Sequence, residues 1–256
     1  MKLNLENKHF LVTGGAKGIG ASVVKLLKME KAKVFVIDKE NANQGEAIDV
    51  RDSKKVYDFI KKMPKLDGLV LNAGLGPFHE DSVAIFETNV IGTLNVLKAC
   101  KEKLTDFSSI VIISSTAGYR NKWDDKWLQY FDFQKKPSFD YKAELKHLSP
   151  EESYRLTKWL LIQATKKFAK DFANKKIRVN CVAPGPTKTE MSKSLWTDNL
   201  SEWKKIISEN PFNLANDTSD VAPIILYLLS KHTKMITGSF LHVDGGWFAT
   251  KALNNT

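Results

Sequence analysis

The stretch KHFLVTGGAKGIG, residues 8–20, constrains the fold of this chain more than any other. Residues 9–12 form a short apolar run, which is typical of a buried strand. A glycine-rich turn follows, and residues 21–29 have the periodicity of an amphipathic helix. Glycines let the backbone approach a pyrophosphate, and the N-terminal end of the new helix favours the phosphate charge. Alone, the turn also fits a plain strand-to-helix connection.

The next segment favours a dinucleotide site. Residues 33–38 are predicted to form a second strand ending in Asp38, which lies 18 residues beyond Gly20. A carboxylate at about this spacing binds the adenine-ribose hydroxyls in nucleotide-binding folds. Because an anion there repels a 2′-phosphate, Asp38 favours NAD, whereas Lys17 and Lys39 would attract such a phosphate. We expect NAD as the cofactor, with NADP as the alternative.

Strand-like apolar runs alternate with helical patterns along nearly the whole chain. Strands are expected at 66–71, 109–115, 177–182 and 239–243, and helices at 53–63, 84–103, 152–174 and, capped by Asp217 or Ser219, up to Leu229. This alternation predicts one doubly wound α/β domain of the Rossmann type over residues 1–256, a parallel sheet with helices on both faces. Ligands bind such sheets beyond the carboxyl ends of the strands.

Composition narrows the function classes. The net charge of +10 invites a nucleic-acid hypothesis, but the lysines are spread through every segment, so a solvated basic surface is the better interpretation. No stretch approaches the roughly 18 apolar residues of a membrane span, and the polar N-terminal residues are not a secretory signal. Cys100 and Cys181 lack metal-ligand spacing and fit buried thiols of a reducing compartment. We expect a cytoplasmic protein without a metal site, nucleic-acid partner or membrane partner.

Four groups at the predicted strand ends, or on the helices that follow, carry chemistry. Tyr154 and Lys158 are four residues apart, which puts a phenol and an ammonium on one helix face. A fixed cation favours the phenolate and lowers the phenol pKa from about 10. The others are the Ser114–Ser115 pair, residues 72–74 (NAG) and Asn89. Each has an ordinary structural explanation by itself, and the lack of a Gly-x-Ser-x-Gly sequence disfavours a hydrolase.

Taken in order, these pieces resemble the short-chain dehydrogenase/reductase family. The matching motifs are TGGAKGIG at 13–20, Asp38, Asp49-Val50, NAG at 72–74, Asn89, ISS at 113–115, YRLTK at 154–158, RVNCVAPGPTKT at 178–189 and HVDGG at 242–246. The resemblance covers essentially the whole chain. It implies an NAD(P)-dependent oxidoreductase that transfers hydride between nicotinamide and a secondary alcohol/ketone pair or an aldehyde.

The resemblance also implies a role for each matching residue. Tyr154 would be the general acid and base, Lys158 would lower its pKa and bind the nicotinamide ribose, and Ser115 would hold the substrate carbonyl. Asn89 would help to carry a water chain that relays the proton. Cofactor contacts would come from the phosphate turn (Gly14, Lys17, Gly18, Ile19, Gly20), the ribose carboxylate Asp38, the adenine frame (Asp49, Val50), the ribose side (Asn72, Ala73, Gly74) and the nicotinamide side (Pro184, Gly185, Thr187, Thr189).

Two segments depart from the usual family pattern. The segment from NAG at 72–74 to Asn89 is short, so we expect that a helix usual in the family is lost. Ser115 and Tyr154 are 39 residues apart, further than in most relatives, and the extra segment at 119–150 is rich in aromatic residues. Such an insertion is too apolar for a solvated loop, so it should cover the site mouth, cover a helix or make a subunit contact. Residues 189–211 are expected to form a mobile apolar lid, with an amphipathic surface helix as the alternative. An apolar lid favours a bulky hydrophobic or aromatic substrate.

The insertion at 119–150, the short segment before Asn89 and the sequence DGLVLNAGLGP at 67–77 look like the bacterial 3α-hydroxysteroid dehydrogenase/carbonyl reductase branch. Aryl-alcohol or aldehyde dehydrogenation and 3-oxoacyl-thioester reduction are the alternatives within the family. A cofactor-binding sensor without catalysis is the alternative from another class, and the intact residues Ser115, Tyr154 and Lys158 disfavour it.

The insertion also bears on assembly. Many relatives are tetramers, and one of their interfaces uses the helices that carry Asn89 and Tyr154. Because residues 119–150 lead directly into the second of these helices, they should obstruct that interface. We therefore expect a homodimer through the helix at 221–229 and the strand at 239–243, with the insertion beside the active-site mouth.

Overall fold

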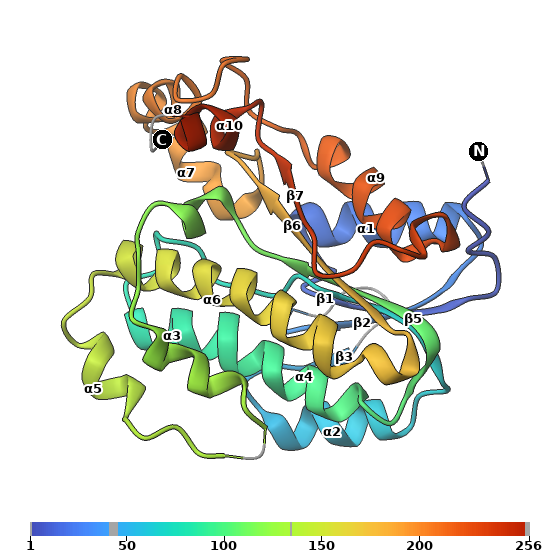
Figure 1. Ribbon diagram of the computed structural model, residues 1–256. Coiled ribbons are helices and arrows are strands. Elements are labelled where there is room, and N and C mark those ends of the chain that lie inside the picture. Colours follow the sequence, from blue (N-terminus) through green and yellow to red (C-terminus); the bar gives the residue numbers. More distant parts are fainter. Residues whose placement is uncertain (1, 41–45, 134, 254–256) are drawn as a thin grey trace.

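A computed structural model of the chain describes residues 2–40, 46–133 and 135–253 (Figure 1). Its middle layer is a sheet whose described strands lie in the order β3-β2-β1-β4-β5-β6-β7, with every pairing parallel. The strands are β1 (His9–Thr13), β2 (Lys33–Asp38), β3 (Glu46–Ala47), β4 (Leu66–Leu71), β5 (Leu104–Ile113), β6 (Arg178–Pro184) and β7 (Phe240–Val243). The order reverses between β1 and β4, and such a switch point is where ligands bind. The predicted doubly wound α/β fold is confirmed.

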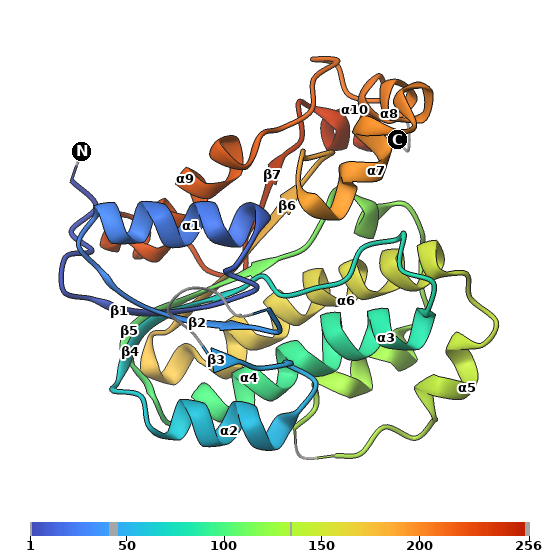
Figure 2. The same cartoon turned by 180° about the vertical axis from the view of Figure 1, so that it is seen from behind.

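Helices cover both faces of the sheet. On one face α1 (Gly18–Met29) lies beside α9 (Thr218–Leu229), as Figures 1 and 2 show. The other face carries α2 (Ser53–Lys61), α3 (Ser82–Phe86), α4 (Thr93–Cys100) and α6 (Pro150–Asp171). Successive residues of β1 point to opposite faces of the sheet. Leu11 belongs to the core under α6, and its neighbours Phe10 and Val12 belong to the core under α1.

Local capping signals place the helix starts close to their predicted positions. The helix α6 begins two residues earlier than predicted because Ser149 and Glu152 form a capping box and Pro150 occupies the first helical position. Of the two candidate caps for α9, the structure uses Asp217, in a capping box with Asp220. Both predicted buried thiols, Cys100 and Cys181, are buried and free.

The predicted helix at 84–103 is interrupted. It consists of α3, a π-helical turn η1 (Glu87–Gly92) and α4. Hydropathy periodicity did not reveal this change of winding, because the apolar residues continue to face the core throughout. By length and composition Ser82–Cys100 is also apolar enough to cross a membrane, but 61% of its most apolar window is buried inside the fold. It is therefore a core helix.

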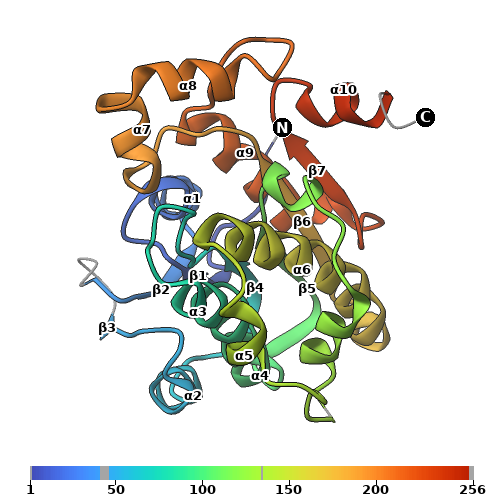
Figure 3. The ribbon, with the colours of Figure 1, turned by 90° about the vertical axis from the view of Figure 1, so that its left-hand side faces the viewer.

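The insertion covers helices, the second of its three predicted placements. It contains a 3-10 helix η3 (Asp125–Phe131) and α5 (Tyr141–Leu145), and its rings pack on the outer side of α3, η1, α4 and α6. Phe131 and Phe133, for example, both contact Phe168 of α6. In Figure 3 α5 lies in the foreground, in the lower half of the view, whereas α7 and α8 lie at the upper left. The expected place of the insertion beside the site mouth stays a prediction.

The segment predicted as a lid folds as η5 (Glu190–Ser192), α7 (Lys193–Thr197) and α8 (Leu200–Ile207). Trp203 is buried, so α8 is an amphipathic helix with one face on the protein. The far end of the segment is anchored at Glu209, which accepts hydrogen bonds from Arg120 Nη2 at 2.6 Å and from Trp247 Nε1 at 2.9 Å. Arg120 is thus the part of the insertion that reaches the lid.

Candidate active site

The phosphate turn joins β1 to α1. Gly14 and Gly18 have positive φ angles of 66° and 57°, which only glycine adopts without strain. A Cβ on Gly20 would lie 2.0 Å from the Gly14 carbonyl oxygen, so no larger residue fits there. The helix begins at Gly18, three residues before its predicted start, so Ile19 belongs to its first turn. The free N–H groups of that turn are what a pyrophosphate requires.

Asp38 lies at the end of β2, against this turn. Its carboxylate accepts hydrogen bonds from the backbone N–H of Ala16 at 2.9 Å and of Glu40 at 3.0 Å. The Lys17 ammonium forms an ion pair with the Glu40 carboxylate, and this hydrogen-bonded contact raises the pKa of Lys17 and lowers that of Glu40. Glu40 was not among the predicted site residues, although it stands only two residues after Asp38. The positive charge of Lys17, the lysine of the phosphate turn, is therefore already paired with the Glu40 carboxylate.

The NAG segment is tied to the phosphate turn from the end of β4. The backbone N–H groups of Asn72 and Ala73 donate to the Thr13 hydroxyl at 3.0 and 3.1 Å, and the Asn72 amide donates to the Gly14 carbonyl at 2.9 Å. A Cβ on Gly74 would lie 2.9 Å from Asn89 Oδ1. Thr13 was missed as a supporting residue, because a threonine at the end of a strand has no distinctive pattern.

The predicted adenine frame lies over the helical layer. Val50 is buried and packs so closely on η1 that a Cβ on Gly92 would come 2.4 Å from its Cγ2 atom. Asn95 of α4 donates to the Val50 carbonyl at 3.0 Å. The Asp49 carboxylate pairs with Arg51 at 2.6 Å, and hydrogen bonding from this guanidinium lowers the pKa of Asp49. The predicted adenine frame is therefore held by contacts from η1 and α4.

Asn89 is fully buried and joins two parts of the site. Its Oδ1 atom accepts from the Leu75 N–H at 2.7 Å. Its Nδ2 atom donates to the Leu75 carbonyl at 3.1 Å and to the Thr157 hydroxyl at 3.0 Å. Thr157 lies on α6 between Tyr154 and Lys158, so Asn89 links the loop after β4 to the helix that carries the phenol.

Tyr154 and Lys158 share a face of α6, as predicted. The Lys158 ammonium is 5.5 Å from the centre of the Tyr154 ring and donates to the Ile113 carbonyl at 3.2 Å. Burial lowers the pKa of Lys158 to about 8. Burial also raises the pKa of Tyr154, and a hydrogen bond with Ser115 only partly opposes this. The pKa of Tyr154 is thus shifted in the direction opposite to the expected lowering, because removal of the phenol from water is the dominant cause.

The two serines after β5 have different surroundings. Ser114 is buried, and its hydroxyl donates to the Lys158 carbonyl at 2.7 Å. Ser115 is half-buried and caps the short helix η2 (Thr116–Tyr119) by accepting from the Ala117 N–H at 3.2 Å. Since Ser115 also hydrogen-bonds the Tyr154 phenol, it is the serine that faces the reacting groups.

The predicted nicotinamide loop follows β6 and is held by β7 and by Asn216. Gly185 N–H donates to the Val243 carbonyl at 2.9 Å, and the Thr187 hydroxyl to the Gly185 carbonyl at 2.9 Å. Asn216 donates to Val243 at 2.7 Å and pairs with the loop through its backbone, a long-range role without a sequence signal. A Cβ on Gly18 would touch Thr189 Cγ2 at 3.4 Å, so the loop meets the phosphate turn.

These surroundings fit a dinucleotide. The close approach at Gly20, the open first turn of α1 and the carboxylate of Asp38 form one side of the cradle, and the loop at Pro184–Thr189 forms the other. Within the described residues no group of His, Cys, Asp and Glu side chains could hold a metal ion.

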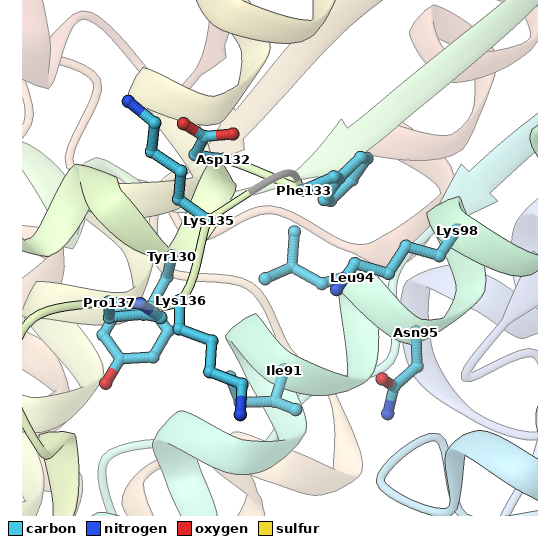
Figure 4. Close-up of a pocket in the computed structure, with 10 residues that line it drawn as sticks. All are labelled: Ile91, Leu94, Asn95, Lys98, Tyr130, Asp132, Phe133, Lys135, Lys136 and Pro137. Atoms are coloured by element: carbon cyan, nitrogen blue, oxygen red, sulfur yellow. The ribbon is translucent and has the colours of Figure 1, made fainter.

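A separate cavity of about 290 Å³ lies between α4 and the insertion (Figure 4). It is lined by Ile91, Leu94, Asn95, Lys98, Tyr130, Asp132, Phe133, Lys135, Lys136 and Pro137. None of the predicted site residues lines it, and Figure 4 shows its three lysines pointing in different directions. The cavity therefore lies apart from the predicted site residues, which gather at the carboxyl ends of the strands.

Comparisons with known proteins agree with this geometry. Residues 8–125 match the family model described as short chain dehydrogenase, and residues 139–248 match the one described as Enoyl-(Acyl carrier protein) reductase. The 3-oxoacyl-[acyl-carrier-protein] reductase FabG of Chlamydia pneumoniae is 30% identical over 281 residues, covering 96% of this chain and 99% of that protein.

Solved structures show the same fold. The structure of ElxO with NADP bound has a TM-score of 0.74 and 28% identity, covering 95% of this chain and 99% of that chain. The 3-alpha-hydroxysteroid dehydrogenase from Pseudomonas sp. B-0831, complexed with NADH, has a TM-score of 0.79 and 24% identity, covering 96% and 99%. At this identity and coverage the chain belongs to the short-chain dehydrogenase/reductase family, and it is an NAD(P)-dependent oxidoreductase acting on alcohol and carbonyl groups.

Proposed function

We propose that this chain interconverts a bulky hydrophobic or aromatic ketone and its secondary alcohol, with Tyr154 as the proton donor and acceptor. The observation that carries this proposal is the convergence of Ser115, Tyr154 and Lys158 beside the phosphate turn and the loop after β6. A sensor that binds the cofactor without catalysis would not need a buried lysine beside a half-buried phenol.

Each group at the proposed site has its own role in the reaction. When bound, the nicotinamide supplies or accepts the hydride. The Tyr154 phenol, kept protonated at neutral pH by its raised pKa, donates its proton to the carbonyl oxygen during reduction. Ser115 donates a hydrogen bond to the same oxygen as negative charge develops on it. Lys158 holds the nicotinamide ribose, and Asn89 orders the groups through which Tyr154 regains its proton.

The surface near the site supports an apolar substrate. Phe78, on the loop after β4, is 51% exposed, and Met191, at the start of the lid, is 45% exposed. A Cβ on Gly76 would lie 2.6 Å from Met191 Cγ, so the lid meets this loop. An open apolar mouth of this kind favours a ring-bearing or long acyl substrate over a small polar one.

A turnover screen tests the proposed activity. We expect ring-bearing ketones, such as steroid ketones and aryl ketones, to be reduced with a kcat/KM at least about tenfold above that of small sugars, because each buried methylene contributes roughly 0.8 kcal/mol. A 3-oxoacyl thioester belongs in the same screen, since the similarity to FabG favours it as the second candidate. Equal rates on sugars and ring-bearing ketones would contradict the apolar site.

Cofactor choice gives a second prediction. NADH should bind more tightly than NADPH, because Asp38 lies against the phosphate turn, where its charge would repel a 2′-phosphate, and Glu40 already pairs with Lys17. Asp38→Ala should narrow this preference by roughly tenfold in the ratio of Kd values, since it removes the repulsion of a 2′-phosphate. Fluorescence titration of both reduced cofactors measures the ratio. A wild-type preference for NADPH would mean that Lys17 and Lys39 outweigh both acids.

Assembly gives a third prediction. We expect a cytoplasmic homodimer that pairs through α9 and β7. The rings of the insertion already cover the outer side of α4 and α6, whereas Pro223 of α9 is exposed and β7 is an edge strand of the described sheet. Light scattering should give the mass of two chains, about 58 kDa from 28.9 kDa each. A tetramer that persists on dilution would show that the insertion permits a second interface.

A further inference from the structure

The turn that carries Asn89 is wound differently from the helices on either side. η1 is a π-helix between α3 and α4, and π turns inside α-helices are rare and frequent at functional sites. On its C-terminal side the Thr93 hydroxyl donates to the Asn89 carbonyl at 2.7 Å. The N-terminal side begins at Phe86 and Glu87, and there the support comes from the insertion.

Three rings of the insertion surround Phe86, the last residue of α3. Tyr141 stacks on it with ring centres 5.0 Å apart and planes at 20°, while Trp127 and Tyr130 each lie at 5.4 Å. Phe86 itself is fully buried. Phe86 comes three residues before Asn89 in the sequence, so these contacts fix the backbone where the π turn begins.

Glu87, the first residue of the π turn, is held by polar contacts from the same segment. The Tyr141 hydroxyl donates to Glu87 Oε1 at 2.7 Å, and the Lys142 ammonium lies 3.2 Å from the same oxygen. Tyr141 thus contacts two consecutive residues, stacking on Phe86 and hydrogen-bonding Glu87.

We propose that Tyr141 is a positioning residue for the reaction: through Phe86 and Glu87 it sets the π turn so that Asn89 bonds both Leu75 and Thr157. The inference rests on the proposed role of Asn89 in returning a proton to Tyr154. By this inference the insertion contributes to catalysis, although the insertion itself lies outside the site. Tyr141 acts through Asn89 and touches neither substrate nor cofactor.

The variant Tyr141→Phe tests the proposal, because it keeps the stacked ring and removes only the hydroxyl. We expect kcat to fall by roughly tenfold, since small displacements of a positioned group are costly, while the Kd of the cofactor stays within about twofold. The solvent deuterium isotope effect on kcat should rise, and imidazole buffer should restore part of the lost rate, because proton return has become limiting. Glu87→Ala should behave in the same way, whereas Glu87→Gln, which keeps an acceptor for the Tyr141 hydroxyl, should retain most of the activity.

Tyr130→Phe is the matched control. Tyr130 belongs to the same aromatic cluster, but its hydroxyl donates to the Phe139 carbonyl and accepts from the Tyr141 N–H, so its bonds stay within the insertion. We expect wild-type kcat and isotope effect from this variant, even if the melting temperature falls. The proposal is overturned if Tyr141→Phe keeps the wild-type kcat and isotope effect, or if both tyrosine variants lose activity equally and without rescue by imidazole.

Hydrogen exchange separates this proposal from the proposed function. Tyr141→Phe should speed amide exchange in Glu87–Gly92 by roughly tenfold, and Tyr130→Phe should leave that segment unchanged. This measurement needs no substrate. If the wild-type enzyme turned over none of the carbonyl compounds in the screen, the proposed function would fail, yet exchange would still show whether Tyr141 holds the turn. Unchanged exchange in Tyr141→Phe would overturn the inference by itself.

Discussion

Replacing Tyr154 by phenylalanine should lower kcat for carbonyl reduction by roughly 10³-fold, within the range that general acids contribute. The phenol is the group hydrogen-bonded to Ser115, and burial keeps its pKa above the ordinary value of 10.0. It is therefore protonated at neutral pH and ready to donate. The Kd of the cofactor should change by less than about twofold, because the variant removes only the transferable proton. Stopped-flow hydride transfer and fluorescence titration measure the two effects.

The control for this experiment is Tyr119→Phe. Tyr119 is half-buried in η2, and its ring packs at a tilt against His242 and Phe248, so losing its hydroxyl should leave the rate near wild type. Alcohol oxidation by the wild-type enzyme needs the phenolate, so its rate should keep rising with pH through pH 10, because the pKa of Tyr154 lies above its ordinary value of 10.0. A Tyr154→Phe enzyme that reduced ketones at the wild-type rate would assign proton donation to another group.

Replacing Lys158 by methionine should abolish activity and also make the protein more stable at neutral pH. Lys158 is only 6% exposed, and its pKa in the folded protein is lowered from 10.5 to about 8. Between these two pH values the unfolded chain binds one proton more than the folded chain, so wild-type stability rises with pH through this window. Below pH 8 the buried cation carries its full cost, which the variant lacks.

We expect Lys158→Met to raise the free energy of unfolding at about pH 7 by roughly 1–3 kcal/mol, and to flatten its rise between about pH 8 and pH 10. The lost bond to the Ile113 carbonyl reduces this gain. Urea unfolding at several pH values measures this change in the free energy of unfolding. The control is Lys170→Met, which removes an equal charge from an exposed position on the same helix. A variant less stable than wild type at neutral pH would show that the ammonium is stabilised where it lies. Retention of a functional residue at a cost in stability is common in active sites.

Sequence motifs predicted most of the framework because their causes are local. The turn at Gly14–Gly20 needs glycine at defined positions, as the 2.0 Å approach at Gly20 shows, and such requirements are visible in the sequence. The start of α6 follows from Ser149, Pro150 and Glu152, which lie within four residues of one another. The four-residue spacing of Tyr154 and Lys158 puts them on one helix face in any α-helix.

The site residues that the sequence did not predict make contacts with residues far from them in the sequence. Asn216 holds the loop after β6, Glu40 pairs with Lys17, and Thr157 completes the contacts of Asn89. Each is an ordinary polar residue whose partner is set by the packing of the sheet and its helices. No periodicity or spacing distinguishes such residues from solvent-exposed ones.

By itself, then, the sequence determined the fold class, the phosphate turn and the helix carrying the phenol and ammonium, because backbone sterics and helical spacing act between near neighbours. Only the tertiary structure decided the pKa direction of Tyr154, the π turn at Asn89 and the place of the insertion on the helical layer. These depend on how much water the folded chain excludes and on which surfaces meet. Both are properties of the packed molecule as a whole.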